Sequence, residues 1–254
     1  MTGSAVRQRP LLPAAVVAAL VAAWWIAVEA TGTFLPTPWE ALKGVGELAA
    51  NGTLAKHVSA SLMRVAIGYG LAALIGIPTG ILMGWFPPLF QALNPVIQAL
   101  RSISPIAWIP LAIVWFGVGN TSPMFLIFLS SVFPMVVGAA SGVHAVEKQF
   151  LRAARNFGLS GHRLLRQVVL PAALPQIITG MRISLGIAWL VVVAAEMVAI
   201  ESGLGYLIID SRNAGNRYDL VVASMMIIGV IGFLLDLGMR RLDRLEEVRW
   251  RYVR

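Results

Sequence analysis

Residues 147 to 175 read EKQFLRAARNFGLSGHRLLRQVVLPAALP and form a basic segment between two long apolar segments. Against one acid, Glu147, the segment carries five basic residues: Lys148, Arg152, Arg155, Arg163 and Arg166. The apolar periodicity predicts two short amphipathic helices that meet at the GLSG sequence, where Gly158 permits a turn. We expect Pro171 to start the following apolar helix.

The expected apolar sides of these two short helices are set by residues three and four apart. Phe150, Ala153, Ala154 and Phe157 form the apolar side of the first helix. Leu164, Leu165, Val168 and Val169 form that of the second. The arginines occupy the other sides, so the segment suits either anionic lipid headgroups or a protein groove.

The chain as a whole has the composition of an integral membrane protein. It has 254 residues, of which 58% are hydrophobic and 13% are charged, whereas soluble domains carry about 25% charged residues. A spanning helix needs roughly 20 apolar residues, so the length allows about six spans and leaves no room for a large soluble domain. We therefore predict an all-α membrane protein with spans at residues 11–30, 61–84, 92–117, 122–143, 173–199 and 219–239.

The distribution of charge predicts the topology. The net charge is +8, and most basic residues lie in the N-terminus, the 147–175 segment and the C-terminal tail, whereas the expected outer loops hold only Lys43, Lys56, Arg212 and Arg217. By the positive-inside rule both termini are cytoplasmic. The N-terminus lacks a small-residue cleavage site before further spans and is interpreted as an uncleaved first helix. Basic blocks between spans also argue against nucleic-acid binding.

This topology divides the chain into three expected regions. Residues 1–60 form the first helix and an outer loop, in which Pro36, Pro38 and Gly52 bracket a short amphipathic segment. Residues 61–241 form the transmembrane core with the loop at 147–171, and residues 242–254 form a basic cytoplasmic tail.

Several kinds of chemistry are excluded by missing motifs. The chain has no cysteine, which excludes thiolate metal sites and cysteine nucleophiles. His57, His144 and His162 are scattered through expected loops without metal-ligand spacing, and no phosphate-binding G-x-x-x-x-G-K-[ST] loop occurs. We expect no enzyme activity, no metal site and no cofactor in this chain.

Small residues recur at intervals of four along the second span. They are Gly68, Ala72, Gly76, Gly80 and Gly84. In lipid such a ridge lets helix backbones approach closely. The ridge predicts tight packing within the chain, with a dimer interface or a moving interface as the alternative.

Polar and proline residues interrupt the third span and recur in the fifth span. Three prolines are expected to kink or break residues 92–117, where Gln98, Arg101, Pro105 and Trp108 would share one face. In the fifth span Arg182, Trp189 and Glu196 recur every seven residues, and about 21 Å separates Arg182 from Glu196. Gln98, Arg101, Trp108, Arg182, Trp189 and Glu196 are candidate pathway residues, with structural roles as the alternative.

The same segment that predicts the helix pair resembles the coupling loop of ATP-binding-cassette importer permeases, E-A-A-x3-G-x9-I-x-L-P. Here the matching residues are Arg152, Ala153, Ala154, Gly158, Val168, Leu170 and Pro171. Arg152 stands at the usual glutamate and Val168 at the usual isoleucine. The sequences SLMRVAIGYGLAALIGIPTGILMGW, LRSISPIAWIPLAIVWFGVG, GIAWLVVVAAEM and SGLGYLI are similar to the branch that imports nitrate, sulfonates, taurine and bicarbonate.

The resemblance implies a permease subunit with a type I importer fold in the bacterial inner membrane, working by alternating access. It implies two cytoplasmic ATPase subunits, which bind ATP and magnesium, a second permease subunit and an extracytoplasmic solute-binding protein. The coupling residues would be Arg152, Ala153, Ala154, Phe157, Gly158, Leu170 and Pro171. Nitrate or an organic sulfonate is the leading cargo class, and uncharged or aromatic precursors are the alternative. The rival interpretation is a self-sufficient secondary transporter or channel, which often shows two related halves.

Overall fold

A computed structural model describes residues 11–32 and 34–242 of the protein, and within these ranges all regular structure is helical. Among the described residues, five helices are long and apolar enough to cross a membrane, and a sixth candidate span consists of two shorter helices separated by a sharp bend. The described residues form two compact units: one contains those up to Leu54 together with Ile208–Ile227, and the other contains Ala55–Leu207 together with those from Ile228 to 242.

The predicted spans correspond to the observed helices, with longer bounds at several ends. The helices are α1 (Leu11–Thr31), α3 (Thr53–Trp85), α6 (Thr121–His144), α9 (Leu170–Ala199) and α11 (Tyr218–Leu242). Because α3 already begins at Thr53, His57 is a buried helical residue and the expectation that it lies in a loop is wrong.

The expected break in the third span is present and is a bend of 83°. Helix α4 (Pro87–Arg101) ends before Pro105, where the short helix η1 (Pro105–Trp108) leads into α5 (Ile109–Phe116). Proline lacks a backbone N–H and disfavours helical backbone in the residue before it, which explains the interruption at this point.

Three shorter helices lie in the loops. Helix α2 (Pro38–Ala50) begins with a capping box, in which Thr37 and Glu40 hydrogen-bond to each other's backbone N–H groups. The bonds from Thr37 lower the pKa of Glu40 below its ordinary value. Helix α7 (Lys148–Asn156) lies between α6 and α9, and α10 (Leu204–Asn213) lies between α9 and α11.

In the smaller unit, α2 packs against the first part of α11. A Cβ built on Gly44 would lie 3.0 Å from the backbone oxygen of Asp219, so the two helices approach closely at this glycine. Arg217 pairs with Glu47 and with Asp219 at 2.7 and 2.8 Å, which joins the two helices by charge as well.

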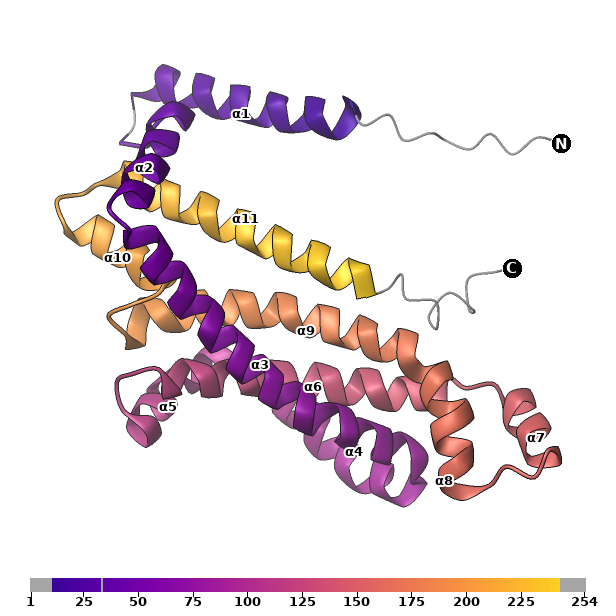
Figure 1. Ribbon diagram of the computed structural model, residues 1–254. Coiled ribbons are helices and arrows are strands. Elements are labelled where there is room, and N and C mark those ends of the chain that lie inside the picture. Colours follow the sequence, from indigo (N-terminus) through magenta and orange to yellow (C-terminus); the bar gives the residue numbers. More distant parts are fainter. Residues whose placement is uncertain (1–10, 33, 243–254) are drawn as a thin grey trace, which may run out of the picture. The chain divides into compact units, whose positions relative to one another are not determined.

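The larger unit is built around α6 and α9, which lie side by side (Figure 1). Gly138 of α6 faces Gly180 of α9, and a Cβ on Gly138 would lie 2.9 Å from the Gly180 Cα. The core beside this crossing contains Ala139, Val143, Val169, Ala173 and Ile177. Small side chains at the crossing allow dispersion contacts between the two backbones, which is the main attraction available between helices in lipid.

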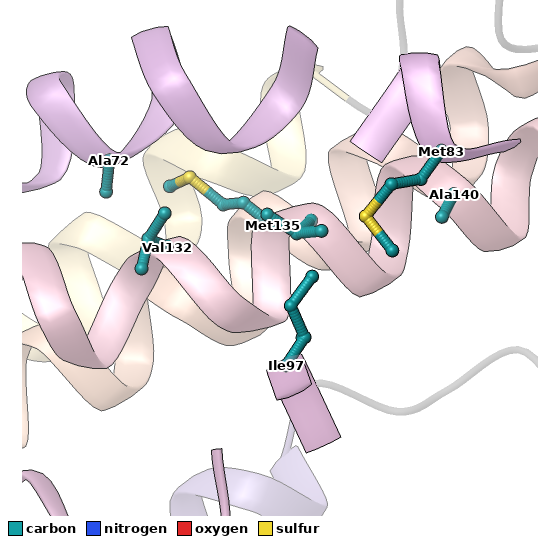
Figure 2. Close-up of a cluster of buried hydrophobic side chains, with 7 residues drawn as sticks. Ala72, Met83, Ile97, Val132, Met135 and Ala140 are labelled. Carbon is teal, nitrogen blue, oxygen red and sulfur yellow. The ribbon is translucent and has the colours of Figure 1, made fainter. Parts of the chain in front are cut away.

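The ridge of small residues on α3 packs against the other side of α6. Figure 2 shows Ala72 and Met83 of α3 beside Val132 and Met135 of α6, with Ile97 of α4 completing this cluster. A Cβ on Gly68 would lie 2.6 Å from the Met124 oxygen, and Gly76 and Gly84 meet α6 in the same way. The close approach of α3 therefore lies within the chain.

Substitution of Gly68 by alanine is expected to reduce the free energy of unfolding by about 1–3 kcal/mol, because the added methyl group overpacks the α3–α6 contact. Gly70 lies on the same helix with no atom within 4 Å of a built Cβ, so it provides a matched control. Gly70→Ala should stabilise the chain by roughly 0.5–1 kcal/mol. Thermal unfolding of the two purified variants measures the difference, and equal effects would contradict the packing described here.

Candidate functional site

The loop at 147–164 is organised by a helix-ending turn at Gly158. The N–H of Gly158 donates to the Arg155 oxygen at 2.9 Å, and the N–H of Leu159 donates to the Ala154 oxygen at 3.0 Å. This pair of bonds is the Schellman arrangement, which places its residue after the cap in the left-handed region. Gly158 has φ +80°. Glycine is favoured at this position because it has no Cβ and adopts positive φ without a steric penalty.

Helix α7 is amphipathic, but its apolar residues divide between two directions. Ala154 is buried and Leu151 packs against the α6–α9 core, whereas Phe150, Ala153 and Phe157 are exposed. Phe157 is 88% exposed. The expectation that Ala154 shares one apolar side with the phenylalanines therefore needs correction: Ala154 anchors α7 to its own chain, and the phenylalanines remain available to a partner.

The second short helix expected in this loop is not separate. Helix α8 (Gly161–Leu164) continues through a π-helical turn, η2 (Leu165–Val169), directly into α9. In this wide turn the Leu170 N–H donates to the Leu165 oxygen. Pro171 removes one backbone donor and crowds the preceding turn, and π-helical turns are one way in which helices absorb such a defect. Leu170 and Pro171 thus lie at the start of α9 inside a continuous helix.

The candidate pathway residues of the broken segment lie on both sides of the bend. Gln98 and Arg101 are exposed on α4, and Pro105 and Trp108 lie beyond the bend on η1. The spacing of these four residues predicted one shared helical face. Because the bend separates them, this prediction is wrong. Trp108 is half-buried and lies 6.4 Å from the Trp115 ring on α5.

Arg182 and Trp189 on α9 both contact α11. The Arg182 Nε lies 2.7 Å from Asp236 Oδ1, and the Trp189 Nε1 donates to the Ile228 oxygen at 3.1 Å. A Cβ on Gly232 would lie 3.0 Å from the Trp189 ring, so α11 approaches the indole closely. These two pathway candidates connect neighbouring helices of the larger unit.

Glu196 forms a buried ion pair with Arg64 of α3. The Arg64 Nη1 and the Glu196 Oε1 are 2.6 Å apart, and the two side chains are 1% and 0% exposed. Ser61 donates to both Glu196 oxygens at 2.8 Å, and the Gly205 N–H donates at 3.1 Å. The carboxylate is therefore enclosed, with its oxygens engaged by side-chain and backbone donors.

The other donors of Arg64 extend this network to two further segments. Its Nε and Nη2 donate to the Asn120 Oδ1 at 2.9 and 2.7 Å, at the start of α6. Its Nη1 and Nη2 donate to the backbone oxygen and hydroxyl of Ser202, between α9 and α10. One guanidinium thereby joins α3, α6, α9 and the 200–205 segment at one end of the larger unit.

The glycines of the ESGLG sequence fit against this ion pair. Gly203 has φ +105°, and a Cβ built on it would overlap the Glu196 carboxylate. Its N–H and oxygen both lie 3.0 Å from the Nδ1 of His57, which is buried on α3. The segment between α9 and α10 therefore packs so closely against the Glu196 carboxylate that a side chain at position 203 does not fit.

Five residues that contact the predicted candidates or one another were not predicted from the sequence: Arg64, Asn120, Ser61, Ser202 and Asp236. Arg64 lies within the predicted span at residues 61–84. The available signal was the cost of an unpaired charge at membrane depth, which requires a partner of opposite sign for Arg64 and Glu196.

Comparison with known proteins identifies the family. Residues 76–247 match the family described as binding-protein-dependent transport system inner membrane component. The chain is 39% identical to the taurine transport system permease protein TauC of Escherichia coli over 237 residues, covering 89% of this chain and 85% of that protein. It is 35% identical to the nitrate import permease protein NrtB of Synechocystis, covering 88% and 84% of the two chains.

A third relative and a solved structure are also similar to this chain. The putative aliphatic sulfonates transport permease protein SsuC of Bacillus subtilis is 37% identical, with 95% of this chain and 86% of that protein covered. A chain of the inward-facing MetNI methionine ABC transporter matches with a TM-score of 0.66 at 18% identity, covering 75% of this chain and 94% of that chain.

A chain of the bacterial alginate ABC transporter matches with a TM-score of 0.56 at 15% identity, covering 92% of this chain and 94% of that chain. These two structural likenesses show the fold, which is that of type I importer permeases. The helical bundle, the α7 loop and the match over residues 76–247 lead to one conclusion: this chain belongs to the family of inner membrane components of binding-protein-dependent transport systems.

Proposed function

We propose that this chain is the membrane-spanning subunit of an ATP-driven importer, which passes an anionic solute to the cytoplasm by alternating access. The observation that carries the proposal is the α7 loop, where Gly158 ends the helix and leaves Phe157 88% exposed beside Arg152 and Arg155. An exposed aromatic side chain next to arginines is the composition of a protein-docking site.

The partner at α7 is a cytoplasmic ATPase subunit. Phe150 and Phe157 would fill an apolar groove, and Arg152 and Arg155 would pair with acidic side chains at its rim. Exposed charge pairs contribute about 0–1 kcal/mol each, so the phenylalanines supply most of the docking energy. Arg152, which replaces the glutamate of the coupling motif, selects an acidic counterpart. ATP and magnesium bind to the ATPase, which provides the energy for transport.

The complete assembly has two ATPase subunits, two permease subunits that are copies of this chain, and an extracytoplasmic solute-binding protein. Both termini and α7 lie on the cytoplasmic side, which the excess of basic residues in these segments supports. The bacterial inner membrane is the location, as the family description suggests.

The transport pathway runs along the broken segment, where Gln98 and Arg101 are exposed and Trp108 follows the bend. Broken helices in membranes are tolerated where they line a cavity or are buried in protein. Arg182, Trp189 and Glu196 act on the pathway indirectly, because their polar groups already contact α11 and α3. An arginine suits an oxyanion, and the named relatives transport taurine, nitrate and sulfonates.

Reconstitution of the full-length chain tests the proposal. Proteoliposomes are prepared with the chain, its ATPase and its solute-binding protein, and uptake of taurine and of nitrate is measured. We expect uptake to require ATP and the binding protein and to stop with vanadate. Uptake by the chain alone, driven by an ion gradient, would instead support a secondary transporter.

Gly158→Val is expected to uncouple ATP hydrolysis from solute uptake, because a β-branched residue does not adopt φ +80° without strain. Displacement of the turn moves Phe157, so ATP hydrolysis should continue while uptake falls at least tenfold. Gly158→Asn is the control, because asparagine tolerates the left-handed region better than other non-glycine residues. Normal coupled uptake by the valine variant would contradict the role of this turn.

A further inference from the structure

A cluster of charges lies between α9 and the last turns of α11. Asp236 pairs with Arg182 through one oxygen and with Arg240 through the other, each at 2.7 Å. The three side chains are 35%, 33% and 56% exposed in the order Arg182, Asp236, Arg240. One carboxylate therefore binds two guanidinium groups, and these three side chains together carry a single net positive charge.

A recess of about 340 Å³ opens beside this cluster. Its lining consists of Thr179, Arg182, Ile183, Gly186 and Asp236. A Cβ built on Gly186 meets no atom within 4 Å, so no part of the chain requires a glycine at this position for close packing. Glycine in a helix interior costs about 1 kcal/mol relative to alanine. The recess has a size found for small-molecule sites and two ionised groups at its wall.

The position of the cluster along the helices indicates which ligand it meets. Arg240 and Arg241 are in the last turn of α11, at the end of an apolar segment that runs from Tyr218 to Arg241. Asp236 lies one to two turns earlier, about 9 Å from the end of α11. Helix α11 has 25 residues and is about 37 Å long, which exceeds the roughly 30 Å of bilayer hydrocarbon, so Asp236 lies close to the boundary with the lipid headgroups at this end of the span. Exposed apolar side chains, Ile183 and Leu190 of α9 among them, continue from the recess toward the middle of the span.

We propose that this recess binds the headgroup phosphate of an anionic phospholipid. Arg182 and Arg240 would donate charge-assisted hydrogen bonds to the phosphate oxygens. Asp236, which lines the recess, accepts from the Nε of each arginine and so holds both guanidinium groups near it. The acyl chains would lie against the apolar surface that includes Ile183. Basic pockets between transmembrane helices on the cytoplasmic side are a known way to hold such lipids. The assignment to the inner leaflet rests on the proposed orientation.

Three variants of the full-length chain test the site by native mass spectrometry and by titration with phosphatidylglycerol and phosphatidylcholine. Wild type should retain phosphatidylglycerol in preference to phosphatidylcholine. Arg240→Gln keeps the Arg182–Asp236 pair and should reduce this preference at least tenfold. Arg241→Gln removes the same charge one residue away, outside the cluster, and should reduce it by less than threefold. Asp236→Asn keeps a side-chain oxygen that accepts from the arginines and removes the negative charge beside the phosphate, so it should increase the affinity for phosphatidylglycerol.

A second pair of measurements examines the recess itself. Gly186→Leu fills the recess without changing charge and should reduce phosphatidylglycerol binding at least fivefold, while Gly70→Leu on a lipid-exposed part of α3 should leave it unchanged. Inorganic phosphate at millimolar concentration should not displace the lipid, because the acyl chains contribute to binding.

Each alternative result would overturn the proposal. Equal losses for Arg240→Gln and Arg241→Gln would indicate diffuse surface charge. Displacement by inorganic phosphate would indicate a site for a soluble anion, and a lack of preference for phosphatidylglycerol in wild type would indicate an ion pair with no lipid function. None of these measurements depends on transport, so failure of the lipid site and failure of the transport proposal are distinguishable.

Discussion

Glu196→Leu is expected to lower the free energy of unfolding by about 3–5 kcal/mol, the largest stability effect among the substitutions considered. The substitution leaves the Arg64 guanidinium buried without its carboxylate, and an uncompensated buried charge is the costly part of a broken ion pair. Thermal unfolding of the purified chain measures this loss. Because Glu196 also accepts hydrogen bonds from Ser61 and Gly205, the 200–205 segment should become accessible to proteolysis.

Two controls separate the buried charge from general damage. Arg64→Met combined with Glu196→Leu removes both charges and should recover most of the lost stability, because buried pairs replaced by apolar residues of similar volume are often neutral. Arg217→Gln breaks the two exposed or part-exposed pairs with Glu47 and Asp219, and the loss of each should cost no more than about 1 kcal/mol. A double variant as unstable as Glu196→Leu would show that the charge is not the cause.

Phe157→Asp is expected to weaken binding of the ATPase at least 30-fold, because it places a charge where an aromatic anchor fills an apolar groove. Truncation of an interface hot spot costs about 2 kcal/mol or more, and every 1.4 kcal/mol is a factor of ten. The stability of the chain alone should not change, because Phe157 is 88% exposed. Titration of detergent-solubilised chain with the ATPase measures the affinity, and vesicle uptake should fall with it.

Phe34→Asp is the matched control for this substitution. Phe34 is 91% exposed and precedes α2, in the loop expected on the opposite side of the membrane. We expect the affinity of the Phe34→Asp variant for the ATPase to equal that of the wild type. Equal affinities for Phe157→Asp and wild type would instead place the ATPase interface outside α7.

The positions of the spans could be predicted because each depends on one local property of the sequence. Hydropathy over about 20 residues identifies a helix that crosses the membrane. The prolines of residues 92–117 predict an interruption, which lies before Pro105, whereas Pro95 is accommodated inside α4. The ridge from Gly68 to Gly84 indicated close packing without naming the partner. The structure gives that partner as α6.

The contacts between distant residues could not be predicted in the same way. Arg64 and Glu196 are separated by 132 positions, and helical periodicity describes only the faces of one helix. The spacing of Arg182, Trp189 and Glu196 gave their common helix correctly. It did not give the partners Asp236, Ile228 and Arg64, which depend on how three helices pack.

The α7 loop has one feature that depends on local sequence and others that depend on packing against the rest of the chain. The Gly158 turn follows from local sequence and is present as a Schellman arrangement. The direction of Ala154 and the continuation of α8 into α9 depend on the core beneath the loop, where Leu151, Ala154 and Val169 are packed. Amphipathicity alone does not distinguish an apolar residue that meets its own chain from one that meets a partner.

Cross-linking from the α7 loop tests whether this loop contacts the ATPase. Since the chain has no cysteine, Phe157→Cys introduces a unique thiol in the middle of the proposed ATPase interface, and Phe34→Cys provides an equally exposed thiol elsewhere. The assembled transporter is treated with a short thiol-reactive photo-crosslinker, with and without ATP. We expect a covalent product with the ATPase from position 157, with a yield that changes on addition of ATP, and no such product from position 34. Cross-linking of the ATPase from position 34, or its absence from position 157 in an assembly that still transports, would contradict this expectation.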